Sequence, residues 1–283
     1  MNRPRRHHFV PRFYLDGFCA DDARTLAVYD RVRNMYRAQH PTELAHRRDY
    51  YAYEDEQGEL VFDIEVGLGQ VETAAALAIR RVDGGEELTA DDRLVLATYT
   101  AFQFARTPAY AAWIAAFRKN WTDEARQMLE GTIPEAPDPR VGRGAALGEM
   151  LRHAPRFAEV FLRLNWTIWR RESERSSFVT TDSPVSLVQA GQREANIYQG
   201  TGILSPDAIT VLPLSQATAL AMSGIGDRVG NRPLTRDQVR RVNLAVVNQA
   251  HGFVFGRDMT LIQNLVQTTG IDQRQWQPPL RVE

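Results

Sequence analysis

Apolar side chains follow a helical spacing through the middle of the first half of the chain. Over residues 64–83 they recur at three- and four-residue steps, and the pattern stops at Gly84. This spacing gathers them on one face of an amphipathic helix. A second run starts at Thr89, a good N-cap with two aspartates after it, and extends over residues 89–118. Because Pro108 interrupts this run, we expect the second long helix to kink or restart there.

The later part of the chain alternates between apolar and polar residues in short runs, which is typical of β-strands. We expect strands at residues 26–29, 166–170, 177–181, 208–212, 218–222 and 253–255, and further helices at 122–129, 145–164, 235–246 and 260–266. Three prolines predict a linker or lid at about 131–144, between a helical half and a β-richer half. Helices and strands are segregated, so we predict an α+β fold, a single domain over residues 1–283 in which a helical core packs on a mixed or antiparallel sheet from the C-terminal half.

Composition narrows the class of protein. With 283 residues, 43% of them hydrophobic, the chain can bury a substantial core. The single cysteine, Cys19, cannot form an intramolecular disulfide, which fits a reducing compartment. No secretion signal and no run of eighteen apolar residues is present. We therefore expect a cytoplasmic protein with no membrane partner.

The charges nearly cancel, at 34 basic against 35 acidic residues, so any binding of phosphate must be local. Lys119 is the only lysine, which indicates a compositional bias toward arginine. The number of arginines is therefore no evidence for phosphate recognition, and each must be judged by its position.

Two adjacent imidazoles, His7 and His8, make the N-terminal segment a candidate site. Neutral imidazoles bind metals and act as acids or bases near neutral pH. In an extended strand adjacent side chains point to opposite faces, so only one of the two should face a given site. The alternative is that both are ordinary, partly exposed residues or a cloning remnant.

A single arginine stands inside an aromatic stripe of the second long helix. Arg106 has Tyr99, Phe102 and Tyr110 at helical spacing around it. A guanidinium in such surroundings is partly buried and must find an anion. Gln103 lies one turn earlier and can face the same space. The anion is either a ligand or a carboxylate of the protein, in which case the pair would only fix the helix.

Two carboxylates could complete a site. Glu72 lies at the edge of the apolar face of the first helix, where it could pair with Arg106, hold a metal or act as a base. A simple ion pair with Arg106 is the commoner outcome. Asp182 opens the turn Asp182-Ser183-Pro184 after an expected strand, and strand ends often carry sites, although this is also an ordinary turn.

The signals of several common enzyme classes are missing from the sequence. It contains no phosphate-binding loop of the type G-x-x-x-x-G-K-[ST], no dinucleotide fingerprint, no H-E-x-x-H and no G-x-S-x-G. The lone cysteine also excludes a zinc knuckle. These absences argue against most enzyme classes that have a known sequence signature.

Several short motifs nevertheless resemble one family. They are His7-His8-x-x-Pro11-x-x-Tyr14-Leu15-x-x-Phe18, Val28-Tyr29-Asp30, Glu72, Gln103-x-x-Arg106-Thr107-Pro108 and Phe178-x-Thr180-Thr181-Asp182-Ser183-Pro184-Val185. In this order, and over residues 7–256, the chain resembles the bacterial family called domain of unknown function 4238. The resemblance implies that His7 and His8 are native residues and marks the polar positions chosen above, but it implies no activity.

Two hypotheses follow from these residues. In the first, the protein is a hydrolase, a metal-dependent phosphodiesterase or nuclease of a bacterial conflict or defence system, acting on a phosphate-containing substrate or nucleic acid. Its catalytic set would be His7, His8, Glu72, Gln103, Arg106 and Asp182. Of these, His7, Glu72 and Asp182 would hold a divalent metal such as Mn, Zn or Mg, and Arg106 would stabilise a phosphate oxygen. This hypothesis predicts that the set converges in one pocket.

The second hypothesis is a non-enzymatic binding or sensor module. The same polar residues would then form a buried hydrogen-bond network that ties the N-terminus across the helices.

Overall fold

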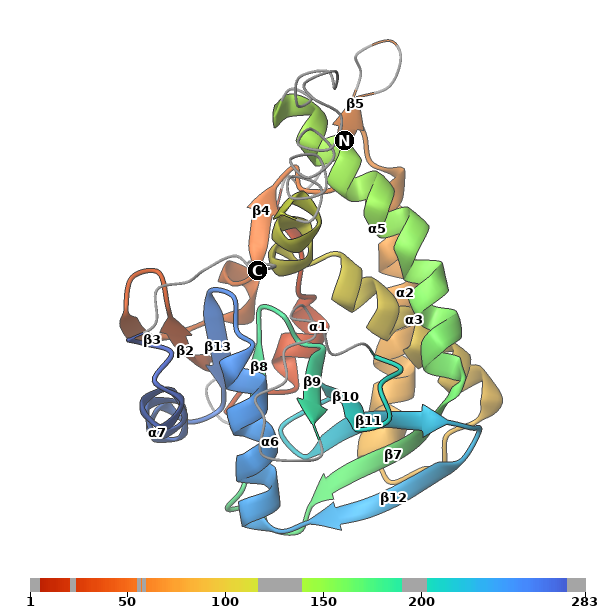
Figure 1. Cartoon of the computed structure of the whole chain (residues 1–283). Coiled ribbons are helices and arrows are strands. Elements are labelled where there is room, and N and C mark those ends of the chain that lie inside the picture. The colour runs from red at the N-terminus through yellow and green to blue at the C-terminus, as the bar shows by residue number, and fades with distance from the viewer. Residues whose placement is uncertain are drawn as a thin grey trace, which may run out of the picture.

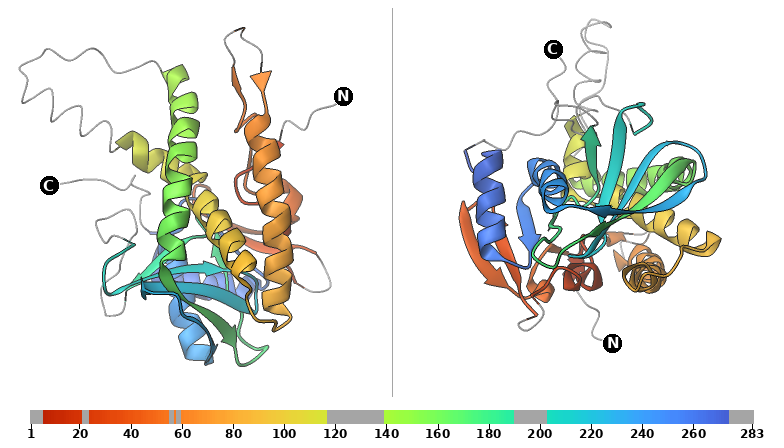
Figure 2. Two further views of the ribbon diagram at one scale, coloured as in Figure 1. Left: turned by 90° about the vertical axis from the view of Figure 1, so that its right-hand side faces the viewer. Right: turned by 90° about the horizontal axis from the view of Figure 1, so that it is seen from below.

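The computed structural model describes residues 6–20, 24–54, 57, 60–116, 139–189 and 203–273. Three long helices lie side by side, with α3 packed between the other two (Figures 1 and 2). They are α2 (Asp63–Asp83), α3 (Ala90–Ala105) and α5 (Pro139–Leu162). Shorter helices are α1 (Arg12–Asp16), α6 (Arg236–Asn248), α7 (Met259–Thr269) and the 3-10 turn Pro41–Glu43.

The start of α3 confirms its expected cap. The Thr89 hydroxyl accepts a hydrogen bond from the backbone N–H of Asp92, and the Asp92 carboxylate accepts one from the N–H of Thr89. The helix ends at Ala105, and the chain is helical again from residue 108. The expected restart at Pro108 is therefore confirmed, because the backbone before a proline avoids the helical conformation.

Five strands from the C-terminal half form a mixed sheet beneath the long helices (Figure 2, left). In spatial order they are β12 (Val229–Leu234), β7 (Leu164–Arg171), β11 (Thr218–Ile225), β10 (Ala208–Pro213) and β9 (Ser186–Gln189). All neighbours are antiparallel except β12 and β7, which run parallel. The predicted sheet of the C-terminal half is thus confirmed.

A second sheet joins the two halves of the chain. Its antiparallel order is β3 (Met35–Gln39), β2 (Leu26–Asp30), β13 (Phe253–Gly256) and β8 (Thr180–Thr181). Two small pairs complete the described strands: β1 (Arg6–His8) with β4 (His46–Arg48), and β5 (Tyr53–Glu54) with β6 (Leu60–Val61). The N-terminal motif is therefore held in a strand by residues about forty positions further along the chain.

The predicted α+β class is confirmed. The predicted boundary of the proline-rich linker needs a correction, and one predicted helix falls on residues that the structure does not describe. Because α5 begins at Pro139, residues 139–144 are helical and the predicted linker ends too late. Proline is well tolerated in the first turn of a helix, where its missing N–H would have no partner anyway. The rest of that linker, at 131–138, and the helix expected at 122–129 lie outside the described residues. Within the described part of the chain, no helix is long and apolar enough to cross a membrane.

The N-terminal segment is part of the hydrophobic core. Helix α1 lies between the second sheet and the long helices (Figure 1), and Tyr14, Leu15 and Phe18 are fully buried. The same cluster of buried apolar side chains extends over both sheets to Ile271 near the end of the described chain. This burial brings the polar residues of the segment against α2 and α3.

Candidate functional site

Arg106 is buried and paired with a carboxylate of the protein. Arg106 is 3% exposed, and its Nη1 donates a hydrogen bond of 2.6 Å to Oε1 of Glu72 on α2. Burial works to lower the pKa of Arg106, but the neighbouring Tyr51, Glu72 and Tyr99 raise it above its ordinary value. The guanidinium therefore stays charged, and the predicted requirement for an anion is met by Glu72.

Gln103 connects this ion pair to the N-terminal segment. Its side-chain oxygen accepts hydrogen bonds from Nε, at 3.1 Å, and Nη2 of Arg106. Its amide nitrogen donates to the backbone carbonyl of Phe9 at 3.0 Å. The expectation that Gln103 and Arg106 face the same space is confirmed, and the side chain of Glu72 and the Phe9 carbonyl occupy it.

His7 lies on the buried face of β1; its Nδ1 is hydrogen-bonded, whereas its Nε2 lies beside a carboxylate without a hydrogen bond of good geometry. Nδ1 accepts a hydrogen bond of 3.0 Å from the backbone N–H of Tyr51, so this nitrogen carries the lone pair and the neutral ring is protonated at Nε2. Nε2 lies 3.0 Å from Oε2 of Glu65, and the ring stacks on Tyr51. Burial and the nearby Glu72 raise the pKa of Glu65, whereas His7 works to lower it. In this arrangement His7 has no lone pair left for a metal.

His8 occupies the opposite face of the same strand, as the alternation along a strand requires. Its ring packs edge-on against His46, with the centroids 5.5 Å apart. Burial, followed by the influence of His46, lowers the pKa of His8. His7 is fully enclosed, whereas His8 is half-buried on the other face of the strand.

Asp182 fixes the connection that precedes β13. Its carboxylate accepts hydrogen bonds from the backbone N–H groups of His251, at 3.0 Å, and Gly252, at 2.7 Å. These two residues connect α6 to β13, the strand that pairs with β8. Burial raises the pKa of Asp182 to about 6, although these backbone donors oppose the shift. The expected carboxylate at a strand end is present, but it faces the backbone of a neighbouring connection.

The predicted metal set is not assembled. Among the residues that the structure describes, no three histidine, cysteine, aspartate or glutamate side chains form a group that could hold a metal ion. The nearest partner of His7 is Glu65, the partner of Glu72 is Arg106, and Asp182 binds backbone N–H groups. The proposed convergence of His7, Glu72 and Asp182 is therefore not observed.

Three residues of these polar contacts were not predicted from the sequence as members of the site. Glu65 lies seven residues before Glu72, two helical turns away on the same side of α2, and this spacing could have identified it. Tyr14 was visible only as a motif residue; its buried hydroxyl donates to the carbonyl of Pro213 at 2.7 Å and lies 2.8 Å from Oγ1 of Thr180. Tyr51 gave no signal, because its contact with His7 depends on the pairing of β1 and β4.

Replacing Tyr14 by phenylalanine tests whether the motif fastens α1 to both sheets. We expect Tyr14→Phe to lower the free energy of unfolding by about 1–3 kcal/mol, because the Pro213 carbonyl and the Thr180 hydroxyl stay buried without this partner. Urea denaturation measures the change. Tyr53→Phe, at a residue that is 37% exposed, is the matched control and should change stability by less than about 0.5 kcal/mol. Equal losses for both variants would contradict this role of Tyr14.

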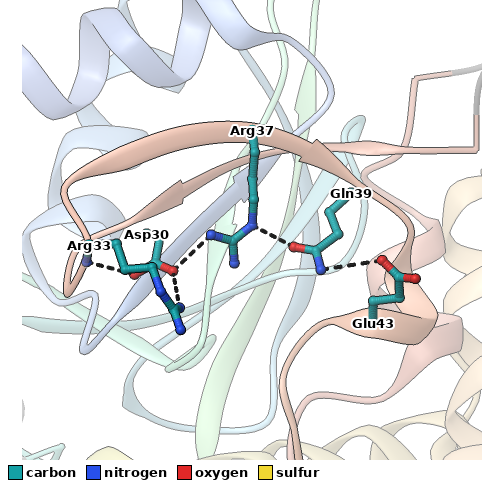
Figure 3. A network of polar contacts seen from close by, with 5 residues as sticks. All are labelled: Asp30, Arg33, Arg37, Gln39 and Glu43. Carbon is teal, nitrogen blue, oxygen red and sulfur yellow. Dashed lines mark hydrogen bonds and ion pairs between the residues drawn. The ribbon is translucent and has the colours of Figure 1, made fainter.

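Asp30, like Asp182, is a buried carboxylate of the family motifs that binds groups of the protein itself. Asp30 at the end of β2 is fully buried and accepts hydrogen bonds of 2.9 Å from both Arg33 and Arg37 (Figure 3). Arg37 also donates to Gln39, which in turn donates to Glu43. Burial works to raise the pKa of Asp30, but the two arginines outweigh it and hold the pKa below its ordinary value. Asp30 thus closes the β2–β3 hairpin.

Fold and contacts together define an α+β protein whose N-terminal motif is fastened to helices and sheets by buried polar side chains. A family model described as "Protein of unknown function (DUF4238)" matches residues 6–260. The chain belongs to this family, as the motifs predicted. No curated protein and no solved structure matches the chain.

Proposed function

We propose that this protein is a non-enzymatic binding module in which the polar motif residues hold the fold together. The proposal rests on one observation: the polar groups of the motif residues contact other groups of the protein. Arg106 binds Glu72 and Gln103, both ring nitrogens of His7 face protein groups, and Asp182 accepts from two backbone N–H groups. A reacting centre needs groups that can reach a substrate, whereas Arg106 and Asp182 are already hydrogen-bonded inside the protein and Nε2 of His7 lies against Glu65.

The proposal includes a cytoplasmic setting in a bacterial conflict or defence system, with an anionic ligand bound outside the buried network. The lone cysteine supports the compartment. A metal-dependent hydrolase, a phosphodiesterase or nuclease, is the competing prediction.

Thermal unfolding with and without EDTA separates the two. We expect the chelator to shift the melting temperature of the native protein by less than about 1 °C, because no bound metal contributes to stability. His7→Ala should lower the free energy of unfolding by about 2–4 kcal/mol, since it removes a buried ring and leaves the Tyr51 N–H without an acceptor. His40→Ala, at a half-buried histidine outside the network, removes only the cap of the turn Pro41–Glu43 and should cost about 1 kcal/mol.

Direct assays complete the test. The native protein is incubated with Mn²⁺, Zn²⁺ or Mg²⁺ and with single-stranded DNA, duplex DNA, RNA and a phosphodiester reporter. The binding module gives no product with any of them. Metal-dependent cleavage that His7→Ala or Arg106→Ala abolishes in folded protein would overturn the proposal in favour of the hydrolase.

A further inference from the structure

Two open cavities lie away from the buried network and are lined by arginines. The first, of about 590 Å³, is formed by α1, the end of α2 and the β10–β11 turn. The second, of about 460 Å³, is formed by the segment after β7 and the first residues of α6 and α7, two helices that pack together (Figure 1). We call the two cavities together the arginine groove.

Two hydrogen bonds show that the cavities share a wall. Arg171, which lines the first, donates to the carbonyl of Ser176, which lines the second, at 2.9 Å. Arg257, which lines the second, donates to the side chain of Gln216, which lines the first, at 3.0 Å. The two cavities are therefore neighbours in the fold.

The arginine groove is positively charged although the chain as a whole is not. Its arginines are Arg12, Arg24 and Arg171 in the first cavity and Arg175, Arg236, Arg240 and Arg257 in the second. Four carboxylates line the same cavities, which leaves a formal charge of +3 against −1 for the whole chain. Arginine and lysine together make up roughly one residue in eight of the sequence, whereas arginine is more than one in four of the lining. A general bias toward arginine does not explain this local enrichment.

Arg12 lies 3.8 Å from the carboxylate of Asp16 on the same helix, but two other arginines of the groove contact neutral acceptors and keep their positive charge available. Arg240 donates to the hydroxyl of Thr268 and Arg257 to the amide oxygen of Gln216, and both acceptors are neutral. Two of the opposing carboxylates already have donors. Asp83 accepts from the hydroxyls of Ser215 and Thr218, and Asp258 caps α7 through the N–H of Leu261. Guanidinium groups held in this way bind phosphate oxygens well, because their planar N–H pairs match them.

The lining also indicates which kind of phosphate ligand fits. No phenylalanine, tyrosine or tryptophan occurs among the described residues that line the two cavities. Proteins that bind single-stranded nucleic acid or isolated nucleotides commonly stack the bases on aromatic rings. Duplex nucleic acid keeps its bases stacked internally and presents a regular row of phosphates. Two neighbouring clusters of arginines without aromatic side chains can bind such a row of phosphates.

We propose that the arginine groove binds double-stranded nucleic acid through its phosphate backbone. This inference rests on the proposed binding function and names its ligand and site. Recognition through phosphates predicts little sequence preference and a steep dependence on salt, because each contacted phosphate releases condensed counterions.

Fluorescence anisotropy with a labelled DNA duplex of about 20 base pairs and mixed sequence tests the groove. The full-length protein is titrated at NaCl concentrations from about 50 to 200 mM. The double variant Arg236→Gln/Arg240→Gln should weaken binding roughly tenfold and make the slope of log affinity against log salt shallower by about 2. Arg12→Gln/Arg24→Gln should act in the same direction if both cavities contact the duplex.

Matched controls come from the same helices. Arg241 is exposed on α6 beside Arg240 but lines neither cavity, and Arg80 is exposed on α2 near the first cavity without lining it. Arg241→Gln and Arg80→Gln should leave affinity within about twofold of the native protein. Circular dichroism confirms that each variant is folded.

The outcomes distinguish the site from the general function. Equal losses in the groove and control variants overturn the groove while leaving the protein a binding module. Preference for single-stranded DNA or free nucleotides overturns the duplex as ligand. Absence of any binding at the lowest salt overturns the nucleic-acid inference, and the chelator and activity experiments then decide the proposed function by themselves.

Discussion

Replacing Arg106 by alanine is expected to lower the free energy of unfolding by about 3–5 kcal/mol. Glu72 would lose the cation that it binds at 2.6 Å, and Gln103 would lose the donors to its side-chain oxygen. Gln103 also holds the Phe9 carbonyl, so the N-terminal strand would be loosened together with the helices. Equilibrium unfolding in urea measures the loss, and proteolysis of the N-terminal segment should become faster in native conditions.

The size of this effect depends on burial, so the control is an exposed arginine. Arg80→Ala on α2 should cost less than about 0.5 kcal/mol. A double-mutant cycle of Arg106→Ala with Glu72→Gln should give a coupling energy of about 1–3 kcal/mol. A loss at Arg106 no larger than at Arg80 would show that the network contributes nothing to stability. A coupling energy near zero would show that Glu72 is not the partner that matters.

The second large effect is a pH dependence at Asp182. Burial raises the pKa of this carboxyl from its ordinary 3.8 to about 6. The folded protein therefore binds the proton more tightly than the unfolded chain does. The resulting stabilisation is fully present below about pH 4 and is lost as the pH rises through 6. The difference corresponds to about 3 kcal/mol.

Asp182→Asn removes this titration while keeping a side chain of the same shape. We expect the free energy of unfolding of the native protein, relative to the Asp182→Asn variant, to fall by about 2 kcal/mol between pH 4 and pH 7. Unfolding in urea at a series of pH values measures it. A difference between the two proteins that does not change with pH would contradict the raised pKa of Asp182.

The neighbouring His251 requires a control because it titrates in the opposite sense. Burial, with help from Arg47 and Arg31, lowers the pKa of His251 to about 4. Its contribution to stability is present above about pH 6.5 and is lost as the pH falls, which masks part of the Asp182 effect in the native protein alone. The same comparison in a His251→Gln background isolates Asp182 and should give the same change.

The candidate site could be predicted only in part from the chemistry and spacing of its residues. Arg106 could be identified as buried, and Glu72 as its commonest partner, because helical spacing fixes which side chains share a face. The same reasoning could not exclude a ligand, since either a carboxylate or a phosphate would satisfy a buried guanidinium. His7 was expected to meet Glu72, yet it lies against Glu65, one of several carboxylates on the same helix.

The arginine groove could not have been found from sequence. Its seven arginines come from segments spread between residues 12 and 257, and single arginines carry no signal in an arginine-rich chain. Only folding brings them to one surface, where their charges add.

By itself, the sequence determined the α+β class, the two long helices with the break at Pro108, and most strands of the C-terminal sheet. These features depend on local periodicity, caps and proline geometry, which neighbouring residues specify. The tertiary structure alone decided the second sheet, the pairing of β1 with β4, and the partners of His7, Tyr14 and Asp182. Those contacts join residues about 40 to 200 positions apart, so they depend on how the whole chain packs rather than on any local pattern.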